Sequence, residues 1–200
     1  MTLIAVCQLK GGAGRSTVAT NLSVGLDALL IDADPPQWSA AAWGAVRGVD
    51  VPAVSNHREL VDRVPLQGWA VVDLPPRFAE MTRAALALAD IALIPVTPGV
   101  ADLWAVEDLL PIITEAKAVN PDLKVRLVWN RLRAFVGSEV ELQTQARRDL
   151  PIKPLRASLG YRLAYPQAFI EGKSVLEGSN VKARDEMAAM VAEVQRLGRA

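Results

Sequence analysis

Residues 10–17, KGGAGRST, combine the amino-acid types that bind phosphate. Their three glycines would let the backbone approach a ligand closely and point N–H groups at it, and a helix starting after them would add its positive end. The common pattern G-x-x-x-x-G-K-[ST] is broken twice, because Leu9 takes the first glycine position and Arg15 the lysine position. We predict a phosphate-binding loop with altered chemistry; the alternative is an ordinary glycine-rich turn.

Carboxylates after two apolar runs could serve a metal ion and a water molecule. Asp73 follows the run WAVV, where it would hold Mg²⁺ through the water shell of the ion or, alternatively, cap a helix. Asp32 and Asp34 would point to one side if their strand continued, so that both could face one ligand. In the loop, Ser16 would place its hydroxyl on Mg²⁺ and Thr17 would contact phosphate.

Short apolar runs must position these residues. Runs rich in Val and Ile, without alternation, are typical of strands buried on both faces, which belong to parallel sheets covered by helices. Helical spacing over 81–89 and 102–119 implies right-handed crossovers, so we predict a doubly wound, mostly parallel α/β sheet flanked by helices. Ligands bind such sheets at the carboxyl ends of the strands. The predicted strands cover 3–6, 28–32, 69–74, 91–96 and 125–130.

Composition limits the class of protein. A chain of 200 residues, 51% hydrophobic, predicts one domain over 1–200. No apolar stretch approaches the roughly 18 residues that a membrane span needs, and we expect a cytoplasmic protein. Cys7, the single cysteine, is interpreted as a buried core thiol, with a catalytic thiol as the alternative. One cysteine cannot ligate an iron–sulfur cluster.

Charge and amphipathicity suggest two surfaces. Net charge is zero, yet nine basic and three acidic residues lie between Lys124 and Arg162. This segment could contact DNA phosphates without sequence preference, or it could be an ordinary solvated face. The stretch 183–200 has an apolar helical face and a polar face of mixed charge, which favours packing against the domain over membrane binding.

With Lys10 before its glycines, the loop resembles the deviant Walker A loop of the ParA family of partition ATPases, relatives of MinD. Further segments resemble the family in the expected order, over nearly the whole chain. We expect the small form, without a helix-turn-helix domain before the loop. The matching segments are LLIDADPPQ (29–37), AVVDLPP (70–76), IPVTPGVADLWAVEDL (94–109), LVWNR (127–131) and AFIEGKSVLE (168–177).

The resemblance implies a P-loop ATPase that uses ATP or ADP with Mg²⁺. Asp34 would orient the attacking water, and Asn130 would bond adenine unless it only satisfies its strand end. Lys10 would reach the nucleotide of a partner subunit, unless it is a solvated loop charge. The predicted catalytic residues are Lys10, Arg15 and Asp34; the metal site is Ser16, Asp32 and Asp73; the nucleotide contacts are Lys10, Gly11, Gly12, Ala13, Gly14, Arg15, Ser16, Thr17 and Asn130.

Arg15 leaves the rate of hydrolysis open. Its planar guanidinium keeps the charge of lysine but not its shape. Binding with slow hydrolysis, near-normal activity and little use of nucleotide are the three outcomes, of which we favour the first.

Three functions follow from the resemblance. The leading one is a ParA-like ATPase of plasmid or chromosome partition. It would dimerise with ATP, bind DNA nonspecifically at the nucleoid, and hydrolyse ATP slowly under the stimulus of a centromere-binding adaptor protein. The alternatives are a nucleotide-dependent scaffold dimer without hydrolysis and a MinD-like positioning regulator that cycles on membranes. The mixed charge of the C-terminal stretch argues against the membrane.

Overall fold

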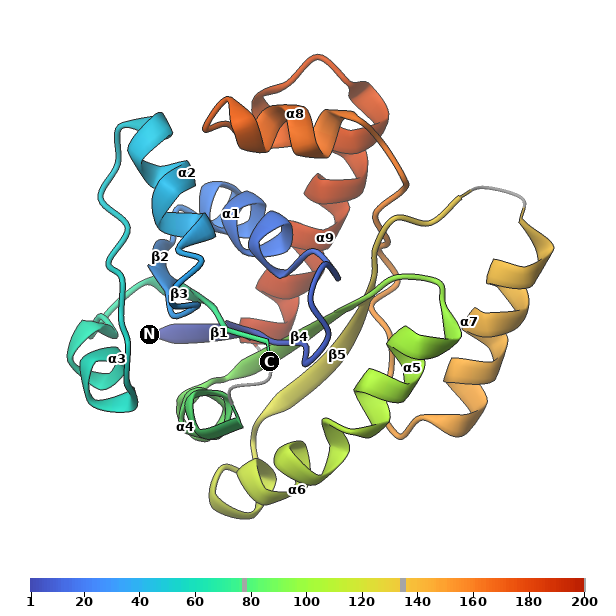
Figure 1. Ribbon diagram of the computed structural model, residues 1–200, viewed down its shortest axis with the longest axis horizontal. Coiled ribbons are helices and arrows are strands. Elements are labelled where there is room, and N and C mark those ends of the chain that lie inside the picture. Colours follow the sequence, from blue (N-terminus) through green and yellow to red (C-terminus); the bar gives the residue numbers. More distant parts are fainter. Residues whose placement is uncertain (77–78, 134–135, 200) are drawn as a thin grey trace.

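The computed structural model describes residues 1–76, 79–133 and 136–199. Within them, five parallel strands form one sheet in the order β2-β3-β1-β4-β5 (Figure 1). The predicted doubly wound α/β fold is confirmed, and the order reverses beside central β1, where such sheets bind ligands. The strands are β1 (Thr2–Val6), β2 (Leu29–Asp32), β3 (Trp69–Asp73), β4 (Ile91–Val96) and β5 (Lys124–Trp129).

Helices cover both faces of the sheet (Figure 1). Alternate strand residues divide between two apolar clusters: Ile4 and Val71 face α1, α2, α8 and α9, while Leu3 and Ala70 pack with the helices of the other face. The unbroken apolar runs are thereby explained. The helices are α1 (Arg15–Leu26), α2 (Ser39–Arg47), α3 (His57–Arg63), α4 (Ala79–Leu88), α5 (Val100–Glu107), α6 (Leu110–Val119), α7 (Gly137–Asp149), α8 (Ala164–Ile170), η1 (Val175–Glu177) and α9 (Val181–Arg199).

The predicted helix over 102–119 is two helices. Helix α5 ends at Glu107, and α6 begins at Leu110 with Pro111 in its first turn. Proline has no N–H to continue the preceding helix, but it fits the start of a new one. The prediction of one helix was wrong. It arose because the apolar spacing continues through this break.

Helix α9 packs against the domain, as predicted. Met187, Met190 and Val194 are fully buried in the cluster that also contains α1 residues. Close approach requires Gly25 on α1, since a Cβ there would come within 2.5 Å of a Val191 methyl. Ala200, the last residue of the predicted stretch, lies outside the described residues. No helix that the structure describes has both the length and the apolar composition to cross a membrane.

Cys7 directly follows β1 and is buried. Burial raises the pKa of its thiol to about 12, against a smaller opposing effect of the Arg15 charge. A thiol with this pKa stays protonated at neutral pH, in agreement with the predicted core role.

Candidate functional site

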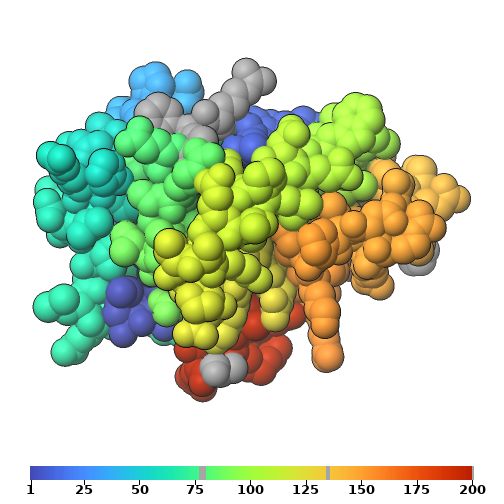
Figure 2. All heavy atoms as spheres, turned by 90° about the horizontal axis from the view of Figure 1, so that it is seen from below, coloured from blue at the N-terminus to red at the C-terminus, as the bar shows by residue number. Residues whose placement is uncertain are grey.

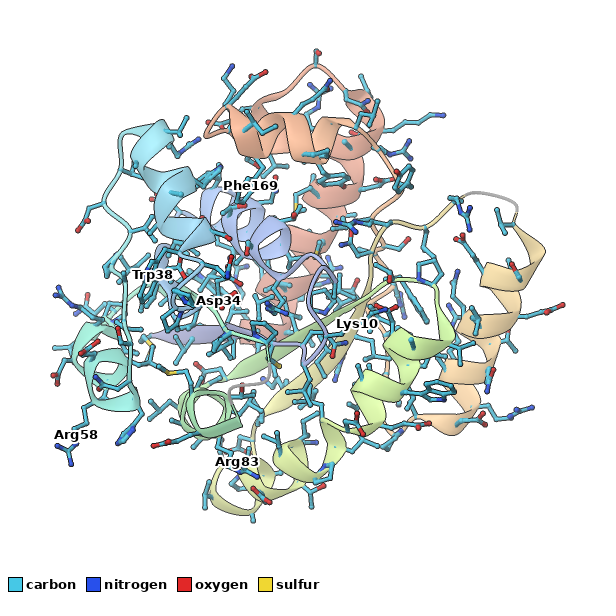
Figure 3. The ribbon with its side chains drawn as sticks, viewed as in Figure 1. Lys10, Asp34, Trp38, Arg58, Arg83 and Phe169 are labelled. Carbon is cyan, nitrogen blue, oxygen red and sulfur yellow. The ribbon has the colours of Figure 1, made fainter. Side chains whose placement is uncertain are left out.

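A cavity of about 800 Å³ opens where the phosphate-type loop meets the end of β5 and the segment 160–170. Its lining includes the predicted residues Gly11, Gly12, Gly14, Arg15, Ser16, Thr17, Asp34 and Asn130. Lys10, Ala13, Asp32 and Asp73 lie outside that lining. Figure 3 shows the labelled Asp34 and Lys10 on either side of the loop, with Phe169 on α8 above them. The structure thus brings residues from five predicted segments to one place.

The loop is shaped by its glycines and by Asn130. Gly14 has φ +96°, and a Cβ there would lie 2.1 Å from the Asn130 side-chain nitrogen. That nitrogen donates a hydrogen bond to the Ala13 carbonyl at 2.8 Å. Only glycine meets both demands at position 14. Asn130 therefore fastens the loop to the end of β5, and its contact with adenine stays a prediction.

The Arg15 side chain folds back into the loop and is only 7% exposed. Its Nη1 donates to the carbonyls of Gln8 and Lys10, both at 2.9 Å, and its Nη2 reaches Asp34 Oδ2 at 3.3 Å. The buried Nε has no partner among the described residues. One guanidinium thus holds two backbone carbonyls at the start of the loop and a carboxylate that follows another strand, β2.

Asp34 and Asp32 have different environments, although they stand two residues apart. Strand β2 ends at Asp32, so the alternation that would place both side chains on one side does not continue. Both Asp32 oxygens accept backbone N–H groups, from Asp34 at 3.0 Å and from Ala41 at 2.8 Å. Asp34 faces the cavity instead; burial raises its pKa, and the Arg15 charge opposes that rise. Asp32 organises the turn, and its part in a metal site stays a prediction.

Asp73 ends β3 with its side chain fully buried. Neither carboxyl oxygen has a hydrogen-bond partner among the described residues, although the Ser16 hydroxyl is close enough to lower the pKa of the group. Burial dominates and, with a smaller contribution from the Asp32 charge, raises that pKa to about 7. The same residues contain no group of three or more His, Cys, Asp or Glu side chains placed for a metal ion.

An unpartnered buried carboxylate beside a serine hydroxyl suits Mg²⁺. Magnesium takes oxygen ligands, keeps several waters, and is commonly bound through one or two carboxylates together with phosphate oxygens of a substrate. Ser16 and Asp73 lie close together at the edge of the loop and would supply such a partial shell. The residues present therefore fit this ion, with the remaining ligands left to a nucleotide and water.

Lys10 is engaged within its own chain. Its Nζ lies 2.5 Å from Asp102 Oδ2 in the first turn of α5, and the lysine side chain is 41% exposed. The second Asp102 oxygen, Oδ1, is buried and unpartnered in the described structure. Sequence reasoning missed Asp102; an acidic residue in the first turn of a helix was the only signal, and it usually indicates a helix-dipole contact.

The wall of the cavity facing the loop is apolar and was also missed. It includes Tyr161, Leu163, Phe169 and Ile170. Leu163 and Ile170 are 70% and 76% exposed. A ligand that filled the cavity would cover part of this apolar surface. The aromatic and aliphatic residues of this stretch were the available signal, because such side chains line sites for flat organic ligands.

Comparison with known proteins agrees with the geometry. Maintenance of carboxysome distribution protein A of Halothiobacillus neapolitanus is 34% identical, over 96% of this chain and 95% of its own length. The protein of that name from Gloeobacter kilaueensis is 33% identical, over 92% of this chain and 88% of its length. No family model matches the chain.

Solved structures share the fold. Apo McdA of Cyanothece superposes with a TM-score of 0.78 at 15% identity, over 97% of this chain and 99% of that one. The cell division protein MinD of Aquifex aeolicus gives 0.74 at 15% identity, over 98% of both chains. From its sequence identity and coverage, the chain belongs to the family of maintenance of carboxysome distribution protein A, within the ParA and MinD type of P-loop ATPases.

Proposed function

We propose that the protein is an ATPase that positions a large cargo, with ATP or ADP and Mg²⁺ bound in the cavity beside the loop. The observation that carries this proposal is the Ser16 hydroxyl beside the unpartnered, buried Asp73 carboxylate at the end of a glycine-rich loop. A buried carboxylate without a partner is costly, so a bound cation would remove the cost.

The side chains of the site would divide the work. Backbone N–H groups of residues 11–17 and the Arg15 guanidinium would bind phosphates, and Asp34 at the cavity wall would orient the attacking water. Mg²⁺ held by Ser16 and Asp73 would neutralise charge on the phosphate oxygens. The apolar wall around Phe169 would take the base, with the Asn130 amide at its edge.

The names of the relatives favour a carboxysome-like cargo over a plasmid or chromosome. Both curated relatives are described as maintaining carboxysome distribution, and they match the chain nearly from end to end. The plasmid-partition neighbour from Borrelia burgdorferi is 16% identical, a level at which only the fold is shared. We therefore propose that the protein positions a carboxysome-like cargo. An adaptor protein on that cargo would take the place of the centromere-binding adaptor.

The proposed carrier surface is nucleoid DNA, bound without sequence preference by a homodimer in the cytoplasm. Six basic side chains of the segment 124–162 have no ion pair among the described residues: Lys124, Arg126, Arg131, Arg147, Lys153 and Arg156. Residues near position 150 form a projecting surface beside α6 in Figure 2. Others in the segment are neutralised, as Arg133 is by Glu139 and Arg162 by Glu186. Salt should weaken this binding steeply.

A nucleotide-dependent scaffold with little hydrolysis is the second candidate. It is favoured by Arg15, whose guanidinium already has three acceptors in the free protein and would exchange its long Asp34 contact when Nη2 binds phosphate. Slow exchange of these contacts would slow turnover.

ATP binding and hydrolysis by the purified protein, with and without Mg²⁺ and nonspecific DNA, test the proposal. Wild type should bind ATP and hydrolyse it slowly. Asp73→Asn should lose hydrolysis that depends on Mg²⁺, while Asp149→Asn, at an exposed carboxylate, should match wild type. Binding without hydrolysis in wild type would favour the scaffold, and equal rates for the two variants would contradict the assigned metal site.

A further inference from the structure

The Arg15 guanidinium joins two segments that are remote in the chain. Through Nη1 it holds the Gln8 and Lys10 carbonyls of the loop, and through Nη2 it holds Asp34 after β2. The Arg15 and Asp34 side chains are each 7% exposed, and both residues line the cavity. The pair is thus shielded from bulk water yet borders the space that a ligand would fill.

Only arginine has the shape for this connection. Its nitrogens form a rigid planar fork, so one end can stay on the loop carbonyls while the other reaches a carboxylate. A lysine carries one nitrogen at the same place and would have to choose among these acceptors. The residue that departs from the usual phosphate-loop pattern is therefore the one that connects the loop to Asp34.

The guanidinium also retains capacity for an anion. Its Nε is buried and has no partner in the described structure. Its contact to Asp34, at 3.3 Å, is longer than the two loop contacts at 2.9 Å. A phosphate oxygen arriving in the cavity would compete first for the Asp34 contact, since charge-assisted bonds of arginine to phosphate are strong and often bidentate.

We propose that Arg15 is a positioning residue for Asp34. In the free protein its guanidinium holds the Asp34 carboxylate against the loop; when a nucleotide binds, the guanidinium exchanges that carboxylate for a phosphate oxygen. Asp34 is then released to face the reacting water. This exchange couples nucleotide binding to the release of the Asp34 carboxylate. The inference rests on the proposed function, because it requires a nucleotide in this cavity.

A double-mutant cycle on ADP affinity, without Mg²⁺, tests the exchange. The four proteins are wild type, Arg15→Lys, Asp34→Asn and the double variant, each checked for folding by circular dichroism. Asp34→Asn should tighten ADP binding about tenfold when Arg15 is present, because the guanidinium no longer has to leave a carboxylate. In the Arg15→Lys background the same change should alter affinity by less than about twofold.

The outcomes separate this inference from the function on which it rests. Equal effects of Asp34→Asn in both backgrounds would mean that the Asp34 charge repels the nucleotide directly. That result would overturn the proposed role of Arg15 and leave the proposed function standing. Failure of wild type to bind ADP would overturn the proposed function and the inference together.

A second measurement needs no variant. The Arg15 Nε–H resonance should shift when ADP is added to wild-type protein labelled with ¹⁵N, since the guanidinium to which it belongs exchanges the Asp34 carboxylate at Nη2 for a phosphate oxygen. The Arg148 resonance, from an exposed arginine paired with Asp149, is the matched control and should stay in place. An unmoved Arg15 signal at saturating ADP would overturn the proposal.

Discussion

Two cations five residues apart in one loop have opposite environments. Arg15 is 7% exposed and has three acceptors from two segments, whereas Lys10 is 41% exposed and has one partner, Asp102 on α5. Removing one partner of a buried charge pair leaves the other uncompensated, while a partly exposed pair is screened by water. Arg15 is therefore built into the loop, whereas Lys10 lies at the surface and contacts a buried carboxylate from there.

The largest effect is expected from Arg15→Ala. It leaves Asp34 and two loop carbonyls without their donor, and should lower the free energy of unfolding of the nucleotide-free protein by about 3–5 kcal/mol. Urea unfolding followed by circular dichroism measures this change. Arg148→Ala, at an exposed arginine, is the control and should stay within about 0.5 kcal/mol of wild type. Similar losses for the two variants would remove the contrast between buried and exposed cations.

Lys10→Ala should lower the rate of ATP hydrolysis far more than it lowers stability. If Lys10 acts on the nucleotide of a partner subunit, ATP hydrolysis should fall about 100-fold. The free energy of unfolding should fall by less than for Arg15→Ala, by about 1–3 kcal/mol, because Lys10 is 41% exposed although the Asp102 carboxylate that it leaves is buried. Steady-state ATPase rates without DNA, with Lys153→Ala as the control, test this. A large loss of stability with normal turnover would reverse the roles assigned to the two cations.

The pH dependence of stability should show that Arg15, and not Lys10, affects the titration of Asp73. Its pKa in the folded protein is raised to about 7, so between about pH 4 and 7 the folded state binds more protons than the unfolded chain, and stability falls as pH rises. Arg15 lowers that pKa, so Arg15→Ala should move the upper end of this window upward by up to about one pH unit. Lys10→Ala should leave it in place.

Unfolding free energies measured from pH 4 to 8 give this window. Asp73→Asn is the control, since an amide does not titrate and this contribution should vanish. A shift of equal size in the Lys10→Ala protein would show that Asp73 responds to the charge of the whole loop, and not to Arg15 in particular.

The smallest effect is expected from Asp102→Asn. It removes the ion pair that holds Lys10 in its own chain, so the dimer proposed to form with ATP should appear at about three- to fivefold lower protein concentration. Sedimentation with ATP over a concentration series measures this midpoint, and Asp108→Asn, at the exposed end of α5, is the control. Weaker association would mean that the pair supports the interface.

The sheet was predictable because its signal is local. Strands covered on both faces need apolar residues at every position, and the runs ending near Val6, Asp73 and Val96 have them. The break before Pro111 was missed because apolar residues recur at helical spacing on both sides of it. Periodicity reports which face is buried, not whether the backbone continues.

The site was predictable to a smaller extent. Residue types indicated a phosphate loop, a serine and a strand-end carboxylate, and the structure places Ser16 beside Asp73. The division between Asp32 and Asp34 was beyond the sequence, because it depends on where β2 ends and on the backbone N–H of Ala41. The apolar wall from Tyr161 to Ile170 reaches the loop only through tertiary packing.

The sequence by itself determined the sheet, the glycine loop before α1, and the presence of a cation at each end of that loop. Tertiary structure decided what those cations do. Arg15 finds Asp34 and the Gln8 carbonyl, and Lys10 finds Asp102, through contacts between segments as far as 92 residues apart. The energy of a charge depends on its burial and its acceptors, and both are set by segments that meet only in the folded chain.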